Sequence, residues 1–348
     1  MDIRNHLLEG QAIPALPLAL DSNRKLSEKH QRALVRYYAA AGCGGLAVAV
    51  HSTQFEIRKP EHGLFRPILE LASQTLDAEL DGTGRTFSKI AGVCGETRQA
   101  VAEAEMAREF GYHAVLASVA AFRDRSEDEV LQHCREVSEV LPLVGFYLQP
   151  AAGGRPLSYR FWRGFAEIEK ALAVKIAPFN RYQTLDVVRA VAESGRKDLA
   201  LYTGNDDNIV VDLLTPFRFA TPQGIAERRI TGGLLGHWGV WTRAAVELFQ
   251  KIRTARESHA LGEGWLEIAA AVTDMNAAVF DPANNFVGCI PGILEVLRRQ
   301  GLVPTNLCLN PHESLSPGQA EELSRVSAAY PELVDDEFVA ENLDRWLD

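Results

Sequence analysis

The sequence predicts a closed (β/α)8 barrel, an α/β fold of the TIM-barrel type, followed by a helical C-terminal extension. Short apolar runs alternate with amphipathic stretches from Ile13 to Ala255, eight such pairs can be counted, and no change of composition separates them. We therefore expect a barrel over residues 1–255 and a helical extension packed on it over residues 256–348. A doubly wound open sheet is the less favoured alternative, because no glycine-rich dinucleotide fingerprint follows the first strand.

Each expected strand is a short apolar run between polar segments. The strands are expected at Ile13–Leu20, Gly45–Val50, Lys89–Val93, Ala114–Ser118, Leu143–Leu148, Ala171–Ala177, Leu199–Thr203 and Ile230–Leu235. Amphipathic patterns predict helices at Ser27–Ala41, Gly63–Ala78, Thr97–Phe110, Asp128–Val140, Tyr159–Glu169, Thr184–Glu193, a short stretch after Asp207, and Trp238–Ala255. Three further helices, at Trp265–Phe280, Pro291–Gln300 and Pro317–Ala329, need a surface for their apolar stripes, either the outside of the barrel or a partner subunit.

Charge and composition exclude several classes of partner. The chain of 348 residues has a formal charge of -10 and a pI near 5.5, which argues against nucleic acid or an anionic membrane. No apolar run has the length of a membrane span, and the N-terminus lacks the apolar core of a signal peptide. Five cysteines without a CxxC pair favour reduced thiols and a cytoplasmic location. The nine histidines show neither an HExxH motif nor a close pair, so we expect no metal site and no cofactor.

Lys175 is the most informative residue, because it interrupts the continuous apolar run Ala171–Ala177. Burial disfavours the ammonium ion and lowers the pKa of a lysine. A neutral amine is the nucleophile that forms a Schiff base with a carbonyl substrate. The alternative is a buried ion pair with a carboxylate, which would leave Lys175 with a purely structural role.

Further candidates follow from the rule that catalytic groups gather at the C-terminal ends of barrel strands. Tyr147 is expected near the end of the fifth strand as a proton carrier, although a core aromatic residue is the simpler interpretation of Tyr147 by itself. The hydroxyls after the second strand would usually cap a helix or form a turn. The expected substrate-binding residues are His51, Ser52, Thr53, Gly204 and Leu235.

Five segments resemble the dihydrodipicolinate synthase / N-acetylneuraminate lyase family of pyruvate-dependent class I aldolases. They are Ile13–Leu18, Ala91–Thr97, Phe146–Pro150, which is similar to the family's Y-N-x-P, Val174–Ile176, and Gly232–Gly236. Tyr147 and Lys175 are 28 positions apart, the spacing expected in that family. The resemblance implies a lysine imine with a 2-keto acid, proton transfer by Tyr147, main-chain donors around Ser52 and Thr53 for the carboxylate, and a homo-dimer or homo-tetramer.

The chain departs from the family where the second substrate is chosen. The family's G-T-T-G-E is replaced by His51–Phe55, and the P-Y-Y whose second tyrosine completes a proton relay is replaced by Val119–Ala121. The arginine that follows Y-N-x-P has no counterpart at the same offset, and Arg155 lies a few residues later.

These observations predict a Schiff-base lyase or aldolase acting on pyruvate or a related 2-keto acid through Lys175. Dihydrodipicolinate synthase itself, which condenses pyruvate with aspartate semialdehyde, is the first alternative. A non-catalytic keto-acid-binding module on the same fold is the second, since a fold does not determine an activity.

Overall fold

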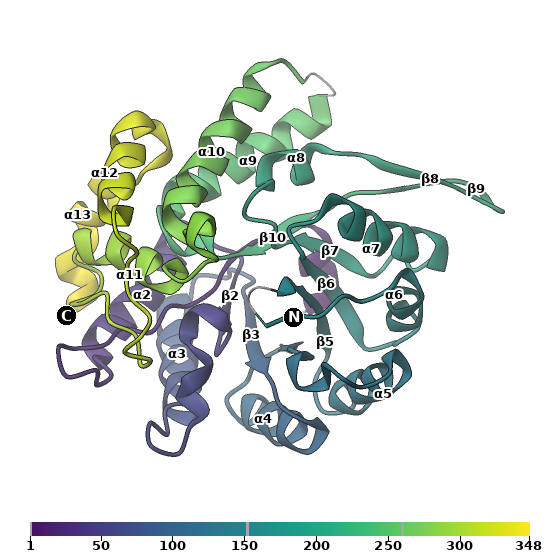
Figure 1. Ribbon diagram of the computed structural model, residues 1–348, viewed down its shortest axis with the longest axis horizontal. Coiled ribbons are helices and arrows are strands. Elements are labelled where there is room, and N and C mark those ends of the chain that lie inside the picture. Colours follow the sequence, from purple (N-terminus) through teal and green to yellow (C-terminus); the bar gives the residue numbers. More distant parts are fainter. Residues whose placement is uncertain (1, 151–152, 259–260) are drawn as a thin grey trace. The chain divides into compact units, whose positions relative to one another are not determined.

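The computed structural model describes residues 2–150, 153–258 and 261–348 and contains an eight-stranded barrel with helices between the strands (Figure 1). The strands follow one another in the order β1-β10-β7-β6-β5-β4-β3-β2. They are β1 (Ala12–Pro14), β2 (Gly45–Val48), β3 (Ser88–Val93), β4 (Ala114–Ala117), β5 (Leu143–Leu148), β6 (Ala171–Ala177), β7 (Ala200–Thr203) and β10 (Gly232–Leu235). A parallel bridge between Ala15 and Ala47 joins the first strand to the second, which confirms the predicted fold class.

The chain divides into two compact units, and each is described by itself. The first unit contains residues up to Gln11 together with Ser88–Leu234. Its parallel strands β3 to β7 are paired in sequence order, and their residues are almost entirely buried. Its helices are α1 (Ile3–Leu8), α4 (Thr97–Glu109), α5 (Glu127–Ser138), α6 (Tyr159–Ala166), α7 (Arg181–Ser194) and α8 (Ile209–Leu214).

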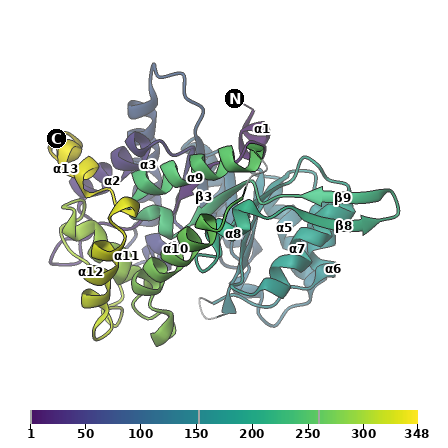
Figure 2. The same ribbon diagram turned by 90° about the horizontal axis from the view of Figure 1, so that it is seen from above.

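The second unit contains Ala12–Phe87 and Leu235–Asp348. Its helices are α2 (Glu28–Ala41), α3 (Phe65–Leu80), α9 (Thr242–Ser258), α10 (Gly264–Phe280), α11 (Cys289–Arg299), α12 (Gln319–Ala329) and α13 (Asp336–Leu347). Helices α13 and α9 pack on α2, whereas α10, α11 and α12 pack on one another (Figures 1 and 2). Buried Tyr37 of α2 donates its hydroxyl proton to Asp335 Oδ2 at 2.7 Å, and Trp346 of α13 packs at 5.5 Å from the Tyr37 ring.

The bounds of the first strand differ from the expectation for a physical reason. The apolar run Ile13–Leu20 predicts a long strand, but β1 ends at Pro14. Pro14 and Pro17 have no N–H group to donate to a neighbouring strand, so the buried residues beyond β1 continue as irregular chain. By contrast, β5 and β6 have the predicted bounds.

The hairpin of β8 (Phe217–Thr221) and β9 (Gly224–Arg228) is not expected from the sequence. It belongs to the first unit and contacts α7 (Figure 2). Its strands alternate half-buried and exposed residues, with Phe217 and Phe219 on the half-buried side. The sequence feature that could have predicted this hairpin is the alternation of apolar and polar residues on either side of a Pro-Gln-Gly turn.

None of the described helices is long and apolar enough to cross a membrane.

Candidate active site

Lys175 lies on β6 in the first unit and is 9% exposed. Its side chain lies over the ring of Phe146, with Nζ at 4.5 Å from the ring centroid. Burial lowers the pKa of Lys175 to about 8, and the negative charge of Asp206 acts in the opposite direction. Among the residues that the structure describes, Lys175 makes no salt bridge and no hydrogen bond. The structural alternative of a buried ion pair is therefore not what the structure contains.

Gly204 follows β7 and lies directly against the Lys175 side chain. A Cβ atom at this position would lie 2.7 Å from Lys175 Cε and 2.7 Å from the Cβ of Ala177. No other residue type fits there without displacing the lysine. The Gly204 N–H donates to Ile176 O at 2.7 Å, so the loop after β7 stays next to the strand that carries the lysine. The structure thus brings together two of the predicted site residues, Lys175 and Gly204.

Tyr147 lies on β5, as predicted, but its side chain does not face Lys175. Its ring packs 5.3 Å from Trp162 of α6, on the helical side of the sheet. Its hydroxyl donates to Leu157 O at 3.2 Å and accepts from Leu157 N at 3.1 Å. Burial raises the pKa of Tyr147. The expectation that this hydroxyl lies beside the lysine amine is corrected: in this structure it holds the chain after β5 on α6.

The cause is a register shift between the two strands. Leu143 pairs with Ala171, and continuing that register would place Tyr147 opposite Lys175. The pairing shifts at the next residue, where Val144 pairs with Ala173, so Phe146 becomes the partner of Lys175. Because side chains alternate between the two faces of a strand, a shift of one residue moves Tyr147 to the other face.

The remaining predicted site residues belong to the second unit. His51, Ser52 and Thr53 form a 3-10 turn after β2, and both hydroxyls donate to Leu16 O, at 3.3 Å from Ser52 and 2.6 Å from Thr53. His51 is half-buried beside Phe55. Leu235 is fully buried at the end of β10. These positions follow strand ends, as the barrel rule requires.

Gln54 stands where the resembling family has glycine, and its backbone has the conformation that favours glycine. Its φ is 68°. The side chain offsets this strain, because Gln54 Oε1 accepts a hydrogen bond from the Leu309 N–H at 2.6 Å in a buried position. The substitution therefore connects the turn after β2 to the C-terminal segment of the same unit.

Asp206, a buried residue of the loop after β7, is not among the site residues predicted from the sequence. It is the charged group whose field acts on Lys175. The signal that could have identified it is its position, two residues beyond the glycine at the end of a barrel strand.

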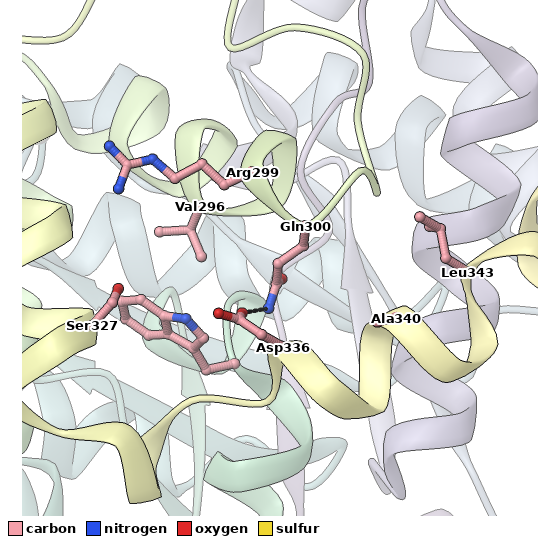
Figure 3. Close-up of a pocket in the computed structure, with 8 residues that line it drawn as sticks. Val296, Arg299, Gln300, Ser327, Asp336, Ala340 and Leu343 are labelled. Atoms are coloured by element: carbon pink, nitrogen blue, oxygen red, sulfur yellow. Dashed lines mark hydrogen bonds between the residues drawn. The ribbon is translucent and has the colours of Figure 1, made fainter.

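A separate cavity of about 310 Å³ lies among the C-terminal helices of the second unit (Figure 3). Its polar wall is formed by Gln300, whose Nε2 donates to Asp335 and Asp336, and by Arg299. Arg299 already donates to Glu295, to Ser324 and to a main-chain carbonyl. These polar groups are used to join α11 to α12 and α13.

No cluster of three potential metal ligands occurs within the described ranges.

The eight parallel strands with helices between them place the chain in the class of (β/α)8 barrel proteins, and a buried lysine in the sixth barrel strand lies against the glycine that follows the seventh. The chain belongs to the dihydrodipicolinate synthetase family, whose model matches residues 9–215. It is 20% identical over 320 residues to N-acetylneuraminate lyase 2 of Escherichia coli O6:H1, covering 90% of this chain and 92% of that protein.

Two solved structures illustrate the similarity of fold. Dihydrodipicolinate synthase of Thermotoga maritima superposes with a TM-score of 0.74 at 18% identity, covering 93% of this chain and 99% of the other. A prophage protein of the dihydrodipicolinic acid synthase family from Escherichia coli K12, solved in complex with pyruvate, gives a TM-score of 0.72 at 16% identity and covers 93% of this chain and 98% of the other. At these identities the superpositions show a shared fold.

Proposed function

We propose that this protein is a Schiff-base lyase or aldolase that acts on pyruvate or a related 2-keto acid through Lys175. The observation that carries the proposal is a buried lysine whose pKa is lowered to about 8 and which makes no salt bridge among the described residues. A substantial fraction of such an amine is neutral near pH 8, and the neutral form attacks a carbonyl carbon. Membership of the family and the pyruvate complex of one structural relative support this choice of substrate.

The carboxylate of the keto acid is assigned, by resemblance, to main-chain donors around Ser52 and Thr53. His51, Gly204 and Leu235 complete the proposed set of substrate-binding residues. The proposal does not use Tyr147 as the proton carrier, because its hydroxyl is hydrogen-bonded to Leu157 on the other face of β5.

Free thiols at all five cysteines are compatible with the cytoplasm, where we propose that the protein works as a homo-dimer or homo-tetramer. Sedimentation velocity tests this assembly.

Dihydrodipicolinate synthase itself is the alternative reaction, and one observation weakens it. Where the synthases have the second tyrosine of P-Y-Y, Ala121 lies exposed in the short 3-10 turn Ala120–Phe122 and has no hydroxyl. Tyr182, a possible substitute on the first turn of α7, is 82% exposed and is not packed into a site within the chain. A keto-acid-binding module without turnover is the alternative of another class.

A turnover screen distinguishes these functions. Pyruvate is offered with a panel of aldehydes in the condensation direction, and candidate 2-keto acids are offered alone in the cleavage direction. An aldolase or lyase gives product with at least one pair, and Lys175→Met removes that product. Binding of pyruvate without turnover or adduct would support the binding module instead.

A further inference from the structure

The loops that follow β6 and β7 are joined by one buried carboxylate, that of Asp212 on α8, which is 1% exposed. We propose that Asp212 is a positioning residue of the active site: it fixes the main chain at Gly204, and Gly204 in turn fixes the side chain of Lys175. Asp212 takes no part in the chemistry itself, because it acts through the residues that it binds. The inference rests on the proposed function, in which Lys175 is the nucleophile.

The carboxylate of Asp212 accepts hydrogen bonds from four side chains. Its Oδ2 accepts from Thr203 Oγ1 at 2.6 Å and from Asn205 Nδ2 at 3.0 Å. Its Oδ1 accepts from Asn208 Nδ2 at 3.1 Å and from Arg181, which also balances its charge. A buried carboxylate is costly unless it is paired and hydrogen-bonded, and both conditions are met here. Because the donors lie at the end of β7, in the loop after it and at the start of α7, the carboxylate holds these segments together.

Gly204 lies between the two residues that bind the same carboxylate oxygen. Thr203 precedes Gly204, Asn205 follows it, and both side chains donate to Asp212 Oδ2. The Asn205 N–H also donates to Thr203 Oγ1 at 3.1 Å, and the Gly204 N–H donates to Ile176 O at 2.7 Å. The main chain at Gly204 is therefore held from both chain directions and by β6.

Gly204 forms a wall against the aliphatic part of the lysine. A Cβ atom on Gly204 would lie 2.7 Å from Lys175 Cε and 3.1 Å from Lys175 Cγ. Since β6 lies between β5 and β7, the lysine is confined from both sides: Gly204 follows β7, and Phe146 belongs to β5. The Nζ atom lies 4.5 Å from the centroid of the Phe146 ring. A shift of Gly204 toward β6 would displace the lysine, and a shift away from β6 would leave its side chain unsupported.

The same network holds a strained residue in the loop after β6. Phe179 has a φ of 51°, a left-handed conformation that is unfavourable for a residue with a side chain. Its N–H donates to Asn205 Oδ1 at 3.0 Å. Strained backbone of this kind persists only where its surroundings hold it in place. Asn205, itself bonded to Asp212, thus connects the loop that follows the lysine strand to Gly204.

A fixed position of the lysine matters for its attack on a carbonyl carbon. The reacting atoms must approach to about 3–3.5 Å in the correct orientation, and a misplacement of about 1 Å can cost about 10²-fold in rate. A lysine side chain is a flexible four-carbon chain, so its amine is poorly placed without packing on either side. Loss of Asp212 should therefore slow the reaction of bound keto acid. It should change the binding of the keto acid little, because the carboxylate of the keto acid is assigned to other residues.

The test compares Asp212→Asn with Asp198→Asn, a matched control in the same unit. Asp198 pairs with Arg4 and Arg196 just before β7, whereas Asp212 binds the opposite end of that strand. Imine formation is measured by borohydride quenching at successive times and at a series of pyruvate concentrations. We expect Asp212→Asn to lower the maximal rate by about 10- to 10²-fold and to keep the half-saturating pyruvate concentration within about twofold of wild type. Asp198→Asn should leave both values close to those of wild type.

Stability alone does not distinguish these variants, because both lose ion pairs and both should unfold at a lower urea concentration. A merely structural Asp212 would lose stability while the folded variant kept the wild-type maximal rate. That result would overturn the inference and leave Lys175 as the nucleophile. An unchanged maximal rate with a raised half-saturating concentration would contradict it as well. A wild-type protein that forms no adduct at all would overturn both the proposed function and this inference.

Thr203→Val tests the route through Gly204, because it keeps the shape of the side chain and removes the hydroxyl that donates to Asp212. If Asp212 acts through this link, the variant with both substitutions should be about as slow as the slower single variant. Multiplication of the two single effects would contradict the route. If Asp212→Asn does not fold, Thr203→Val takes its place beside Asp198→Asn, with the same expected loss in maximal rate and the same contradicting result.

Discussion

The Nζ atom of Lys175 lies 4.5 Å from the centroid of the Phe146 ring, its partner across β5 and β6. The face of an aromatic ring attracts a cation, so Phe146 favours the ammonium form and opposes part of the effect of burial. The pKa of this lysine is thus the result of three influences: desolvation, the ring of Phe146 and the charge of Asp206. Each can be changed by a single substitution.

Replacing Phe146 by leucine removes the ring while keeping an apolar side chain. We expect the pKa of Lys175 to fall further, by up to about one unit for a cation–π contact of roughly 1 kcal/mol. The pH midpoint of adduct formation with pyruvate should move down accordingly. Tyr147→Phe is the matched control on the opposite face of the strand: it should destabilise the fold through the lost bonds to Leu157 and leave the midpoint unchanged. A shifted midpoint in the control instead would place Tyr147 in the chemistry.

Lys175→Met should change the pH dependence of stability in a defined direction. The pKa of Lys175 is lowered from 10.5 to about 8 in the folded protein, so between these pH values the unfolded chain binds more protons, and wild type gains stability as pH rises. Below pH 8 the ammonium costs roughly 3 kcal/mol relative to a lysine in water. We therefore expect Lys175→Met to be relatively most stable near pH 7 and to lose that advantage toward pH 10.5.

Urea unfolding at a series of pH values measures this difference. Lys170→Met is the control, because Lys170 is 47% exposed and paired with Glu139 on the surface. The difference in unfolding free energy between Lys170→Met and wild type should change much less between pH 7 and pH 10.5 than the difference for Lys175→Met. A pH-independent difference for Lys175→Met would mean that the lysine titrates at its ordinary pKa.

Much of the fold follows from the sequence because burial on both faces leaves an unmistakable pattern. The runs Leu143–Leu148 and Ala171–Ala177 are apolar throughout, apart from Tyr147 and Lys175, and they form strands with those bounds. The hairpin Phe217–Arg228 was missed because an exposed, two-stranded element has no continuous apolar run, and its alternation is short.

The nucleophile could be predicted from the sequence, whereas the orientation of its neighbour could not. A charged residue inside an apolar run can be recognised from the sequence alone, and Lys175 is such a residue. The separation of 28 positions between Tyr147 and Lys175 says nothing about which face each residue occupies. That depends on the register shift after Leu143, and a shift of one residue reverses the face.

The buried hydrogen bond between Tyr37 of α2 and Asp335 attaches the C-terminal extension to α2. The hydroxyl donates to Asp335 Oδ2 and accepts from the Thr242 N–H, each at 2.7 Å. Tyr37→Phe leaves both partners buried without this hydroxyl, and we expect a loss of about 1–3 kcal/mol in the free energy of unfolding. Tyr330→Phe, which removes a less buried hydroxyl from Asp274, should cost less than Tyr37→Phe in the same urea titration. Equal losses would contradict the importance of the buried contact.

Condensation of pyruvate with aspartate semialdehyde should be weak or absent. The relay tyrosine of the synthases is replaced by Ala121, and one member of a proton relay contributes about 10²–10⁴-fold to rate. A coupled assay for the cyclic product measures this directly. Turnover in the ordinary range of about 1–10³ per second would show that the protein is a synthase after all.

The most direct test of the central claim is reduction of the imine. The protein is incubated with pyruvate and borohydride, and its peptides are mapped by mass spectrometry, with Lys175→Met as the control that keeps the fold. A neutral buried amine predicts one irreversible adduct, on the peptide that contains Lys175, and none in the variant. An adduct on another lysine, or no adduct with pyruvate, 2-oxobutyrate or glyoxylate, would contradict the assignment of Lys175 as the nucleophile.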